Sequence, residues 1–323
     1  MRTILTLLLL CATGPFAQPA LSQGYPGRPV RLVVGFAPGG AADIVARAMQ
    51  DAVSRSLGQP IVVENRPGAG SSIAAEYVAK SPADGYTLLI ASPSSILVNP
   101  ILSPKAGFDP VRDLAPIGKV STSPLVAAVN PALGAGSLQE LIAIAKRSPG
   151  KLNYSTSGNG SAPHLAAVLF ARLAGVEMVH VPYKGGAPSV QALLAGETQL
   201  SFATPPSVLP LVQAGRLKAL AVTSRNRSPL VPGVPGMAEA GLPDYEIGFW
   251  YGFFAPAGTP EEAIRKVFAA SQAAVKDAKV QEALAPAGTE TAGSASPADF
   301  AAFIAQDARL WARLVKESGA KAD

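Results

Sequence analysis

The sequence predicts an α/β protein, and three observations carry this prediction. Short apolar, β-branched runs alternate with segments whose apolar residues recur at helical spacing. Many connectors between such a run and the next helix are rich in glycine and serine. The length of 323 residues is enough for two domains. The repeated β-α-β-α-β order favours mostly parallel sheets with helices on both faces.

Three strands and two helices alternate in the first third of the chain. Strands are expected at 30–35, 61–64 and 86–91, where apolar and β-branched residues gather. One helix face of apolar residues predicts a helix over 43–57, and a second helix is expected from about Ser71 to Lys80.

The remainder repeats this rhythm. After an apolar stretch at 120–129, Ser137 and Glu140 form a capping box that opens a helix to about Lys146. Further strands are expected at 152–156, 177–181, 200–203, 217–222 and 249–255. Further helices are expected near 162–173, 260–277 and 297–316. The proline- and glycine-rich segment 226–243 is typical of a connector.

The N-terminus has the three-part pattern of a secretory signal. Arg2 gives a basic head, residues 4–10 are apolar, and Gly14-Pro15 ends the run. Small residues at 20 and 22 match the positions that signal peptidase reads, so we expect cleavage after Ser22 and export to the periplasm. A membrane anchor is the alternative, but it needs ~20 apolar residues.

Cys11 is the only cysteine, and it lies inside the expected signal. A lipid-acceptor role is the alternative, although Leu10 is bulky where a small residue is expected. If the signal is cleaved after Ser22, the mature chain has no cysteine, and it can form neither a disulfide nor a thiolate metal site.

The charge pattern argues against a nucleic-acid partner. Charged residues make up 15% of the chain, against about 25% in typical soluble domains. The formal net charge is +5, and the excess is spread along the chain rather than clustered on one face.

Five glycine- and serine-rich connectors suggest an anion site. They are 36–43, 66–72, 91–95, 155–161 and 183–187. Glycine lets the backbone approach a ligand, and amides at a helix N-terminus attract anions. Such loops lie at the carboxyl ends of strands, where open α/β sheets bind ligands. The alternative is that they are only short strand-to-helix turns.

Signals for catalysis, nucleotides or metals are weak. The stretch 68–73 begins like GxGxxG, but Ile73 replaces the third glycine. GxSxG and HExxH are absent from the sequence. His164 with Ser157 or Ser161 leaves a secreted hydrolase as a distant alternative, whereas His180 fits a satisfied core residue. We expect no catalytic residue, no metal and no cofactor.

Two further groups have a structural and a functional interpretation. The aromatic run 249–254 fits a sheet core better than a cleft wall. Arg66 and Lys184 are candidates for ion pairs with a ligand, but such residues more often pair within the protein.

Short stretches in a fixed order make the chain recognisable. They are 25–30 (YPGRPV), 34–40 (VGFAPGG), 63–70 (VENRPGAG), 154–161 (YSTSGNGS), 164–165, 179–187 (VHVPYKGGA), 220–224 (LAVTS) and 254–260 (FAPAGTP). From Tyr25 to Lys321 the chain resembles the Bug-type periplasmic solute-binding proteins of tripartite tricarboxylate transporters.

This resemblance implies a type II periplasmic-binding-protein fold, with two α/β domains and a ligand cleft between them. The chain would cross between domains near 121–124 and 223–227. Domain 1 would comprise 23–122 and 226–323, and domain 2 would comprise 123–225, after a signal peptide over 1–22.

The implied function is capture of a small carboxylate, either a di- or tricarboxylate or an aromatic acid, for uptake by membrane transporter subunits. We expect a monomer that is not an enzyme. A sensing module that signals through a membrane partner is the alternative, because it needs the same cleft. The resemblance assigns ligand contacts to Phe36, Ala37, Gly39, Gly40, Ala41, Ser92, Ser94, Ser157, Asn159 and Thr204.

One departure from the family pattern bears on the ligand. Members often have Phe-Asp-Asn where this chain has Phe202-Ala203-Thr204. An aspartate there would accept hydrogen bonds from an ammonium group, and Ala203 cannot. We therefore expect a preference for carboxylates that lack an amino group.

Overall fold

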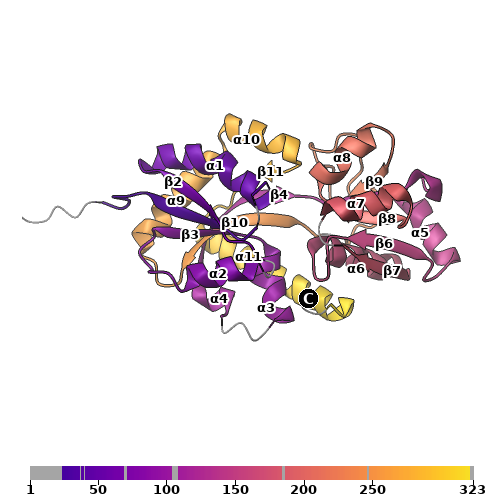
Figure 1. Cartoon of the computed structure of the whole chain (residues 1–323), viewed down its shortest axis with the longest axis horizontal. Helices are drawn as coiled ribbons and strands as arrows, with labels where there is room; N and C mark the ends of the chain where they lie inside the picture. The colour runs from indigo at the N-terminus through magenta and orange to yellow at the C-terminus, as the bar shows by residue number, and fades with distance from the viewer. Residues whose placement is uncertain are drawn as a thin grey trace, which may run out of the picture.

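The computed structural model describes residues 24–320 except 37, 40, 69–70, 104–107, 184–185 and 246. In that part of the chain two β-sheets lie one after the other along the long axis, each covered by helices (Figure 1). The elements around the six-stranded sheet form the first lobe, and those around the five-stranded sheet form the second lobe. The expected signal peptide with Cys11, and Lys184, lie outside the described residues.

The first lobe has strands in the order β11-β4-β10-β3-β1-β2. The strands are β1 (Val30–Val34), β2 (Ile61–Asn65), β3 (Thr87–Ala91), β4 (Leu114–Ser123), β10 (Phe249–Pro256) and β11 (Glu290–Thr291). The longer helices are α1 (Ala41–Leu57), α2 (Ser72–Ala79), α9 (Glu261–Val275), α10 (Ala278–Leu284) and α11 (Pro297–Ser318). Apolar residues of α1, α9 and α10 form one core cluster with the sheet, and those of α2 and α11 belong to another, so both faces are covered.

The second lobe has strands in the order β7-β6-β8-β5-β9. The strands are β5 (Val126–Val129), β6 (Leu152–Thr156), β7 (Met178–Pro182), β8 (Leu200–Ala203) and β9 (Lys218–Val222). The helices are α5 (Leu138–Arg147), α6 (Ala162–Ala174), α7 (Gly186–Ala195) and α8 (Pro205–Gln213). Side chains of α5 and α6 pack in one cluster and those of α7 and α8 in another, so this sheet is also covered on both faces.

Both sheets are mixed, whereas the sequence favoured mostly parallel sheets. The parallel pairs are β1–β2, β1–β3, β6–β7 and β6–β8. β10 runs antiparallel to β3 and β4, and β5 runs antiparallel to β8 and β9. The reason is topological, since β4 leaves the first lobe and β10 returns to it, while β5 enters the second lobe and β9 leaves it.

The expected strands and helices are present, with ends shifted by at most two residues. The elements that the sequence did not indicate are short or open with proline. They are η2 (Ser94–Val98), α3 (Asn99–Leu102), α4 (Pro110–Asp113), η3 (Pro131–Leu133), α8, α10, η4 (Ala285–Ala287) and β11. The apolar stretch 120–129 is divided between the end of β4 and the whole of β5.

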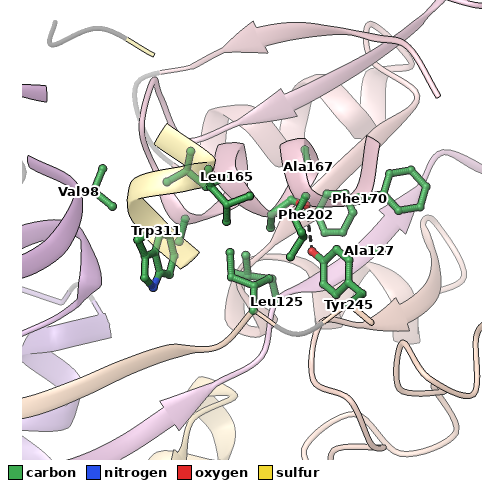
Figure 2. Close-up of a cluster of buried hydrophobic side chains, with 14 of the residues drawn as sticks. Val98, Leu125, Ala127, Leu165, Ala167, Phe170, Phe202, Tyr245 and Trp311 are labelled. Atoms are coloured by element: carbon green, nitrogen blue, oxygen red, sulfur yellow. Dashed lines mark hydrogen bonds between the residues drawn. The ribbon is translucent and has the colours of Figure 1, made fainter. Parts of the chain in front are cut away.

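A continuous apolar core joins the two lobes through α11. Trp311 and Leu314 of α11 are almost fully buried, and they share one cluster with Leu165 of α6 and with Phe202 of β8 (Figure 2). The end of α11 therefore rests on the second lobe, as the yellow helix in Figure 1 shows.

The connector 226–245 also packs on the second lobe. Its apolar residues join the clusters of that lobe. The Tyr245 hydroxyl donates a hydrogen bond to the carbonyl of Ala166 in α6 at 3.0 Å, and its ring stacks near Phe202 (Figure 2). The segment that the sequence marks as irregular is thus fixed by burial together with a series of backbone turn hydrogen bonds.

The aromatic run in β10 is sheet core. Trp250, Tyr251, Phe253 and Phe254 are all buried, and alternate residues belong to opposite core clusters. Asp307, the polar exception on the apolar face of α11, accepts hydrogen bonds from the indoles of Trp250 and Trp311 at 2.7 and 2.8 Å. Burial raises the pKa of Asp307 despite these bonds.

Candidate functional site

Strand directions place the carboxyl edges of the two sheets face to face. β4 is antiparallel to β10, which is antiparallel to β3, so β4 runs in the same direction as β1 and β3. β4 ends at Ser123, and the chain enters the second lobe at Val126. Val126 pairs with Ala203, the last residue of β8, so the carboxyl end of β8 lies at the entry point. The loops after β1, β3, β6 and β8 therefore converge between the lobes.

Two glycines mark where the lobes meet beside these loops. A Cβ on Gly160, before α6, would lie 2.5 Å from Leu102 of α3. A Cβ on Gly288, after η4, would lie 2.1 Å from Pro205 at the start of α8. Both glycines also have positive φ, so close approach and backbone conformation each require glycine there.

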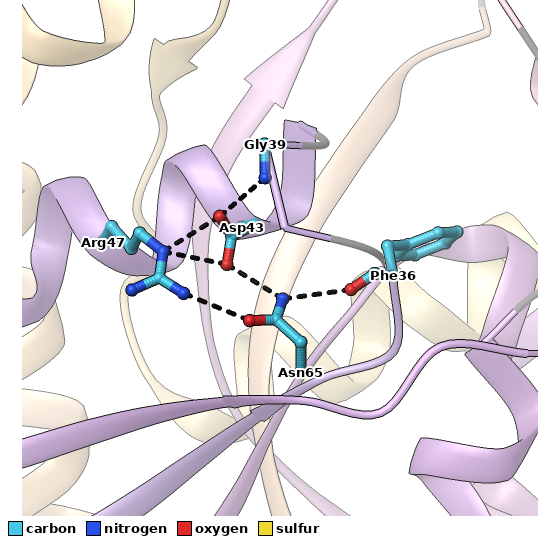
Figure 3. A network of polar contacts seen from close by, with 5 residues as sticks. All are labelled: Phe36, Gly39, Asp43, Arg47 and Asn65. Atoms are coloured by element: carbon cyan, nitrogen blue, oxygen red, sulfur yellow. Dashed lines mark hydrogen bonds and ion pairs between the residues drawn. The ribbon is translucent and has the colours of Figure 1, made fainter.

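The loop after β1 is held by a buried carboxylate at the start of α1 (Figure 3). Asp43 is 3% exposed and accepts hydrogen bonds from the Gly39 amide and from Asn65 Nδ2, both at 2.9 Å. Asn65 Nδ2 also donates to the Phe36 carbonyl at 3.0 Å. The same carboxylate pairs with Arg47 at 2.9 Å. One carboxylate thus fixes the start of the helix, the loop and the end of β2.

The protonation of Asp43 follows from these contacts. Burial raises the pKa of Asp43, but the hydrogen bonds from Arg47, Gly39 and Asn65 outweigh it and leave the pKa below its ordinary value. Asp43 is therefore ionised at neutral pH. Because the Gly39 N–H is directed at Asp43, any ligand contact of Gly39 uses its other atoms.

The residues expected in the first lobe are thus partly placed. Phe36 is half-buried and Gly39 is exposed, while Ala41 begins α1. Ala37 and Gly40 lie outside the described residues.

The loop after β3 carries a buried hydroxyl. Ser92 is fully buried, and its Oγ has no hydrogen-bond partner among the described residues. Its backbone carbonyl and amide are both bonded to the Ser95 hydroxyl. Ser94 is half-buried at the start of η2. A buried polar atom without a partner is unusual, and its place at this edge makes Ser92 Oγ a candidate contact for a small polar ligand or a water molecule once the loop moves.

Ser71 shares this property; it lies in the expected connector 66–72 but was not among the expected ligand contacts. It is fully buried, its Oγ has no partner among the described residues, and its φ is 78°. It lies against Gly35 at the end of β1, where a Cβ would meet Ser71 Oγ at 1.7 Å. The unusual feature of Ser71 is a backbone conformation that normally requires glycine. A sequence does not reveal φ, so this feature could not be predicted.

The loop after β6 brings together the residues expected in the second lobe. Ser157 is half-buried and Asn159 is exposed. Ser161 caps α6 by accepting the His164 amide, and its hydroxyl donates to the Gly158 carbonyl at 2.7 Å. Across the sheet, Thr204 occupies the N-cap position of α8 without a side-chain capping bond, and its hydroxyl lies 3.1 Å from that of Ser207.

The histidines do not form a nucleophile–base pair with a serine in the described structure. His164 Nδ1 accepts the Gly160 amide at 3.1 Å, and His180 Nε2 lies 2.7 Å from Thr156 Oγ1. Burial, together with the neighbouring His180, lowers the pKa of His164 to about 4. Both histidines are thus hydrogen-bonded within the protein.

Other polar candidates pair internally. Arg66 bonds Glu64 at 2.6 Å and lies 3.8 Å above the centre of the Tyr77 ring.

Within the described ranges no group of three or more His, Cys, Asp and Glu is placed to hold a metal ion. None of the helices in that part of the chain has the length and hydropathy needed to cross a membrane.

The architecture and its solved neighbours define the class as a periplasmic binding protein. One solved periplasmic transporter matches with a TM-score of 0.79 and 39% identity, covering 93% of this chain and 100% of that chain. R. palustris Rpa4515 with adipate gives 0.80 and 36% identity, covering 92% and 99%. MatC from Rhodopseudomonas palustris with bound malate gives 0.75 and 32% identity, covering 90% and 100%.

Sequence relatives give the family. The TctC family, described as tripartite tricarboxylate transporter family receptor, matches residues 45–320. Protein BugT of Bordetella pertussis is 39% identical over 321 residues, which cover 99% of this chain and 98% of BugT. The chain belongs to the tripartite tricarboxylate transporter receptor family. It is accordingly a solute-binding receptor of the periplasmic-binding-protein fold and not an enzyme, which confirms the expected class and sets the hydrolase alternative aside.

Proposed function

We propose that this receptor captures a small dicarboxylate between the carboxyl edges of its two sheets. The observation that carries the proposal is that α1 and α6 begin at the facing edges of the two sheets. α8 also begins there, but Pro205 and Pro206 carry no amide hydrogen, so its contribution would be the Thr204 hydroxyl. Helix N-termini present free amides and partial positive charge, which favour carboxylate groups. Two facing sets of such amides suit a ligand with a carboxylate at each end. Support also comes from relatives solved with adipate and with malate.

The contacts proposed for the ligand are those of the four edge loops. They are Phe36, Ala37, Gly39, Gly40, Ala41, Ser92, Ser94, Ser157, Asn159 and Thr204. Neutral hydroxyls and amides would hold the ligand by hydrogen bonds without an opposing charged side chain. Ser71 Oγ is added to this set because it is buried at the same edge without a partner among the described residues.

Ligand binding is proposed to close the lobes about the two crossings. The sequence-based division assigns 23–122 and 226–323 to domain 1 and 123–225 to domain 2. Because the connector 226–245 packs on the second lobe, we propose that it moves with domain 2 and that the second crossing hinges close to Gly248.

Export and partners complete the proposal. A signal peptide over 1–22 would deliver the chain to the periplasm, where it would act as a monomer. Membrane subunits of a tripartite transporter would then receive the ligand from the closed receptor.

The preferred ligand is proposed to lack an ammonium group. Ala203 closes β8 and is 4% exposed, so this position offers a methyl group where a carboxylate would be needed to bind an ammonium. Isothermal titration calorimetry with glutarate and glutamate tests this point, and tighter binding of glutamate would refute it.

A thermal-shift screen tests the binding function itself. Ligands that bind only the folded state raise its Tm. We expect a rise with at least one of the dicarboxylates adipate, malate and glutarate, and no rise when Ser157→Trp fills the space between the edge loops. Ser148→Trp is the matched control, because Ser148 is exposed at the end of α5, near the opposite edge of the sheet. Equal responses of the two variants would place binding elsewhere.

A further inference from the structure

Two histidines from distant parts of the second lobe form a stacked pair behind the loop 156–161. His164 lies in the first turn of α6, and His180 lies in β7. Their ring centres are 3.9 Å apart and the planes differ by 10°. Tyr154 of β6 lies beside the pair, 5.1 Å from His180 and 6.4 Å from His164 between ring centres. The three rings line a cavity of about 680 Å³ bordered by the end of α11.

Each imidazole holds one end of the loop. His164 Nδ1 accepts the amide of Gly160 at 3.1 Å, close to the helix start. His180 Nε2 meets Thr156 Oγ1 at 2.7 Å, at the end of β6. Thr156 Oγ1 in turn lies 3.2 Å from both the amide nitrogen and the carbonyl oxygen of Gly158. The loop that carries Ser157 and Asn159 is thus suspended between two ring nitrogens.

This arrangement requires a neutral His164. An imidazolium has N–H groups at both nitrogens, so it has no acceptor for the Gly160 amide. Burial and the adjacent imidazole lower the pKa of His164 to about 4, and burial lowers that of His180. The other charged or titratable groups around the cavity are Tyr154, Arg172, Glu177 and Glu317, and Arg172 pairs with Glu317 at 3.3 Å.

We propose that His164 and His180 are positioning residues that hold the loop 156–161 through Gly160 and Thr156, and that His164 does so in its neutral form. This inference rests on the proposed binding function. Its consequence is a loop geometry that does not change across the pH range in which an ordinary histidine would titrate.

The test replaces the acceptor and then restores it. Asparagine places Oδ1 near the position of His164 Nδ1, so His164→Asn keeps an acceptor that cannot be protonated in this range. With adipate as the probe, we expect His164→Ala to weaken binding about tenfold, the effect of losing one hydrogen bond, and His164→Asn to recover most of the affinity. Equal affinity of His164→Ala and wild type, or equal loss in both variants, would overturn the proposal.

A second variant covers the case in which His164→Ala does not fold. Thr156→Val keeps the side-chain shape but removes the hydroxyl between His180 and Gly158. We expect weaker adipate binding with Thr156→Val and recovery with Thr156→Ser, and unchanged binding with Thr156→Val would count against the proposal.

Two readouts separate positioning from a general structural effect. In the unliganded protein, hydrogen exchange of the Gly160 amide should accelerate in His164→Ala and not in His164→Asn; equal exchange in both would contradict the proposal. The ratio of wild-type to His164→Asn affinity should stay constant between pH 8 and pH 5.5, and a change centred near pH 6.5 would refute a neutral His164. If wild type binds no diacid, the proposed function fails, whereas the exchange measurement still tests the loop.

Discussion

Replacing Asp43 by alanine is expected to lower the free energy of unfolding by more than an exposed substitution in α1 would. The carboxylate is 3% exposed and joins α1, the loop after β1 and the end of β2. Its removal leaves the Gly39 amide without its acceptor, whereas Asn65 keeps its bond to Phe36.

The magnitude follows from the partners. A hydrogen bond to a charged group contributes about 1.5–3 kcal/mol, and Asp43 accepts two from neutral donors, at Gly39 and Asn65. Arg47 is half-exposed in its side chain, so its ion pair adds at most about 1 kcal/mol. We take the lower end for the neutral bonds, because Asn65 keeps a partner, and expect a loss of about 3 kcal/mol in the free energy of unfolding.

Urea denaturation of the unliganded protein, followed by circular dichroism, measures this loss. Asp51→Ala is the matched control, because Asp51 lies exposed on the same helix. Surface substitutions of that kind usually change stability by less than about 0.5 kcal/mol. Calorimetry with adipate should show weaker binding for Asp43→Ala alone. A loss below about 1 kcal/mol, or equal effects of the two variants, would refute the role given to Asp43.

Three further predictions concern stability. Ser71→Gly should raise the free energy of unfolding by about 1 kcal/mol in urea denaturation, because it relieves a φ of 78° and removes a buried hydroxyl that lacks a described partner; a loss of stability would show that the hydroxyl is needed. His164 has a folded pKa of about 4 against 6.5, so its contribution is complete above pH 6.5 and declines as pH falls toward 4, by about 3 kcal/mol in all. Denaturation across that range should show this decline in wild type and not in His164→Asn, and parallel curves would contradict it. Tyr245→Phe should cost about 1 kcal/mol by deleting the bond to Ala166, and a cost near zero would mean that water replaces the carbonyl's partner.

Local sequence patterns predicted most of the helices and strands. β6 and β8 have the bounds that the sequence predicts, because each is a short β-rich run between turn residues. The capping box was confirmed at Ser137, whose hydroxyl accepts the Glu140 amide. The Glu140 carboxylate bonds the amide of Gly136 instead of Ser137, a one-residue difference that local spacing does not resolve.

α8, whose sequence contains three prolines, was harder to predict. α8 begins with Pro205 and Pro206 and contains Pro210, which in a sequence indicates a break. The first turn of a helix tolerates proline because its amides have no helical acceptor. Burial of Pro205 and Val208 against the second sheet then stabilises a helix that composition alone disfavours.

The support of the site depends on contacts between residues far apart in the chain. Asp43 and Asn65 are 22 positions apart, and Thr156 and His180 are 24 apart. Sequence reasoning located the loops, because glycine and serine mark them, but it has no local signal for a pairing that only strand order creates. The carboxyl-edge loops were therefore predictable, while the groups that hold them were not.

The most direct test of the central claim is a co-crystal structure with the dicarboxylate that gives the largest thermal shift. We predict one ligand between the lobes, with its carboxylates at the starts of α1 and α6 and within reach of Ser92 and Thr204. A ligand bound instead in the cavity beside His164, or on the outer surface of either lobe, would contradict the proposal that the facing carboxyl edges form the binding site.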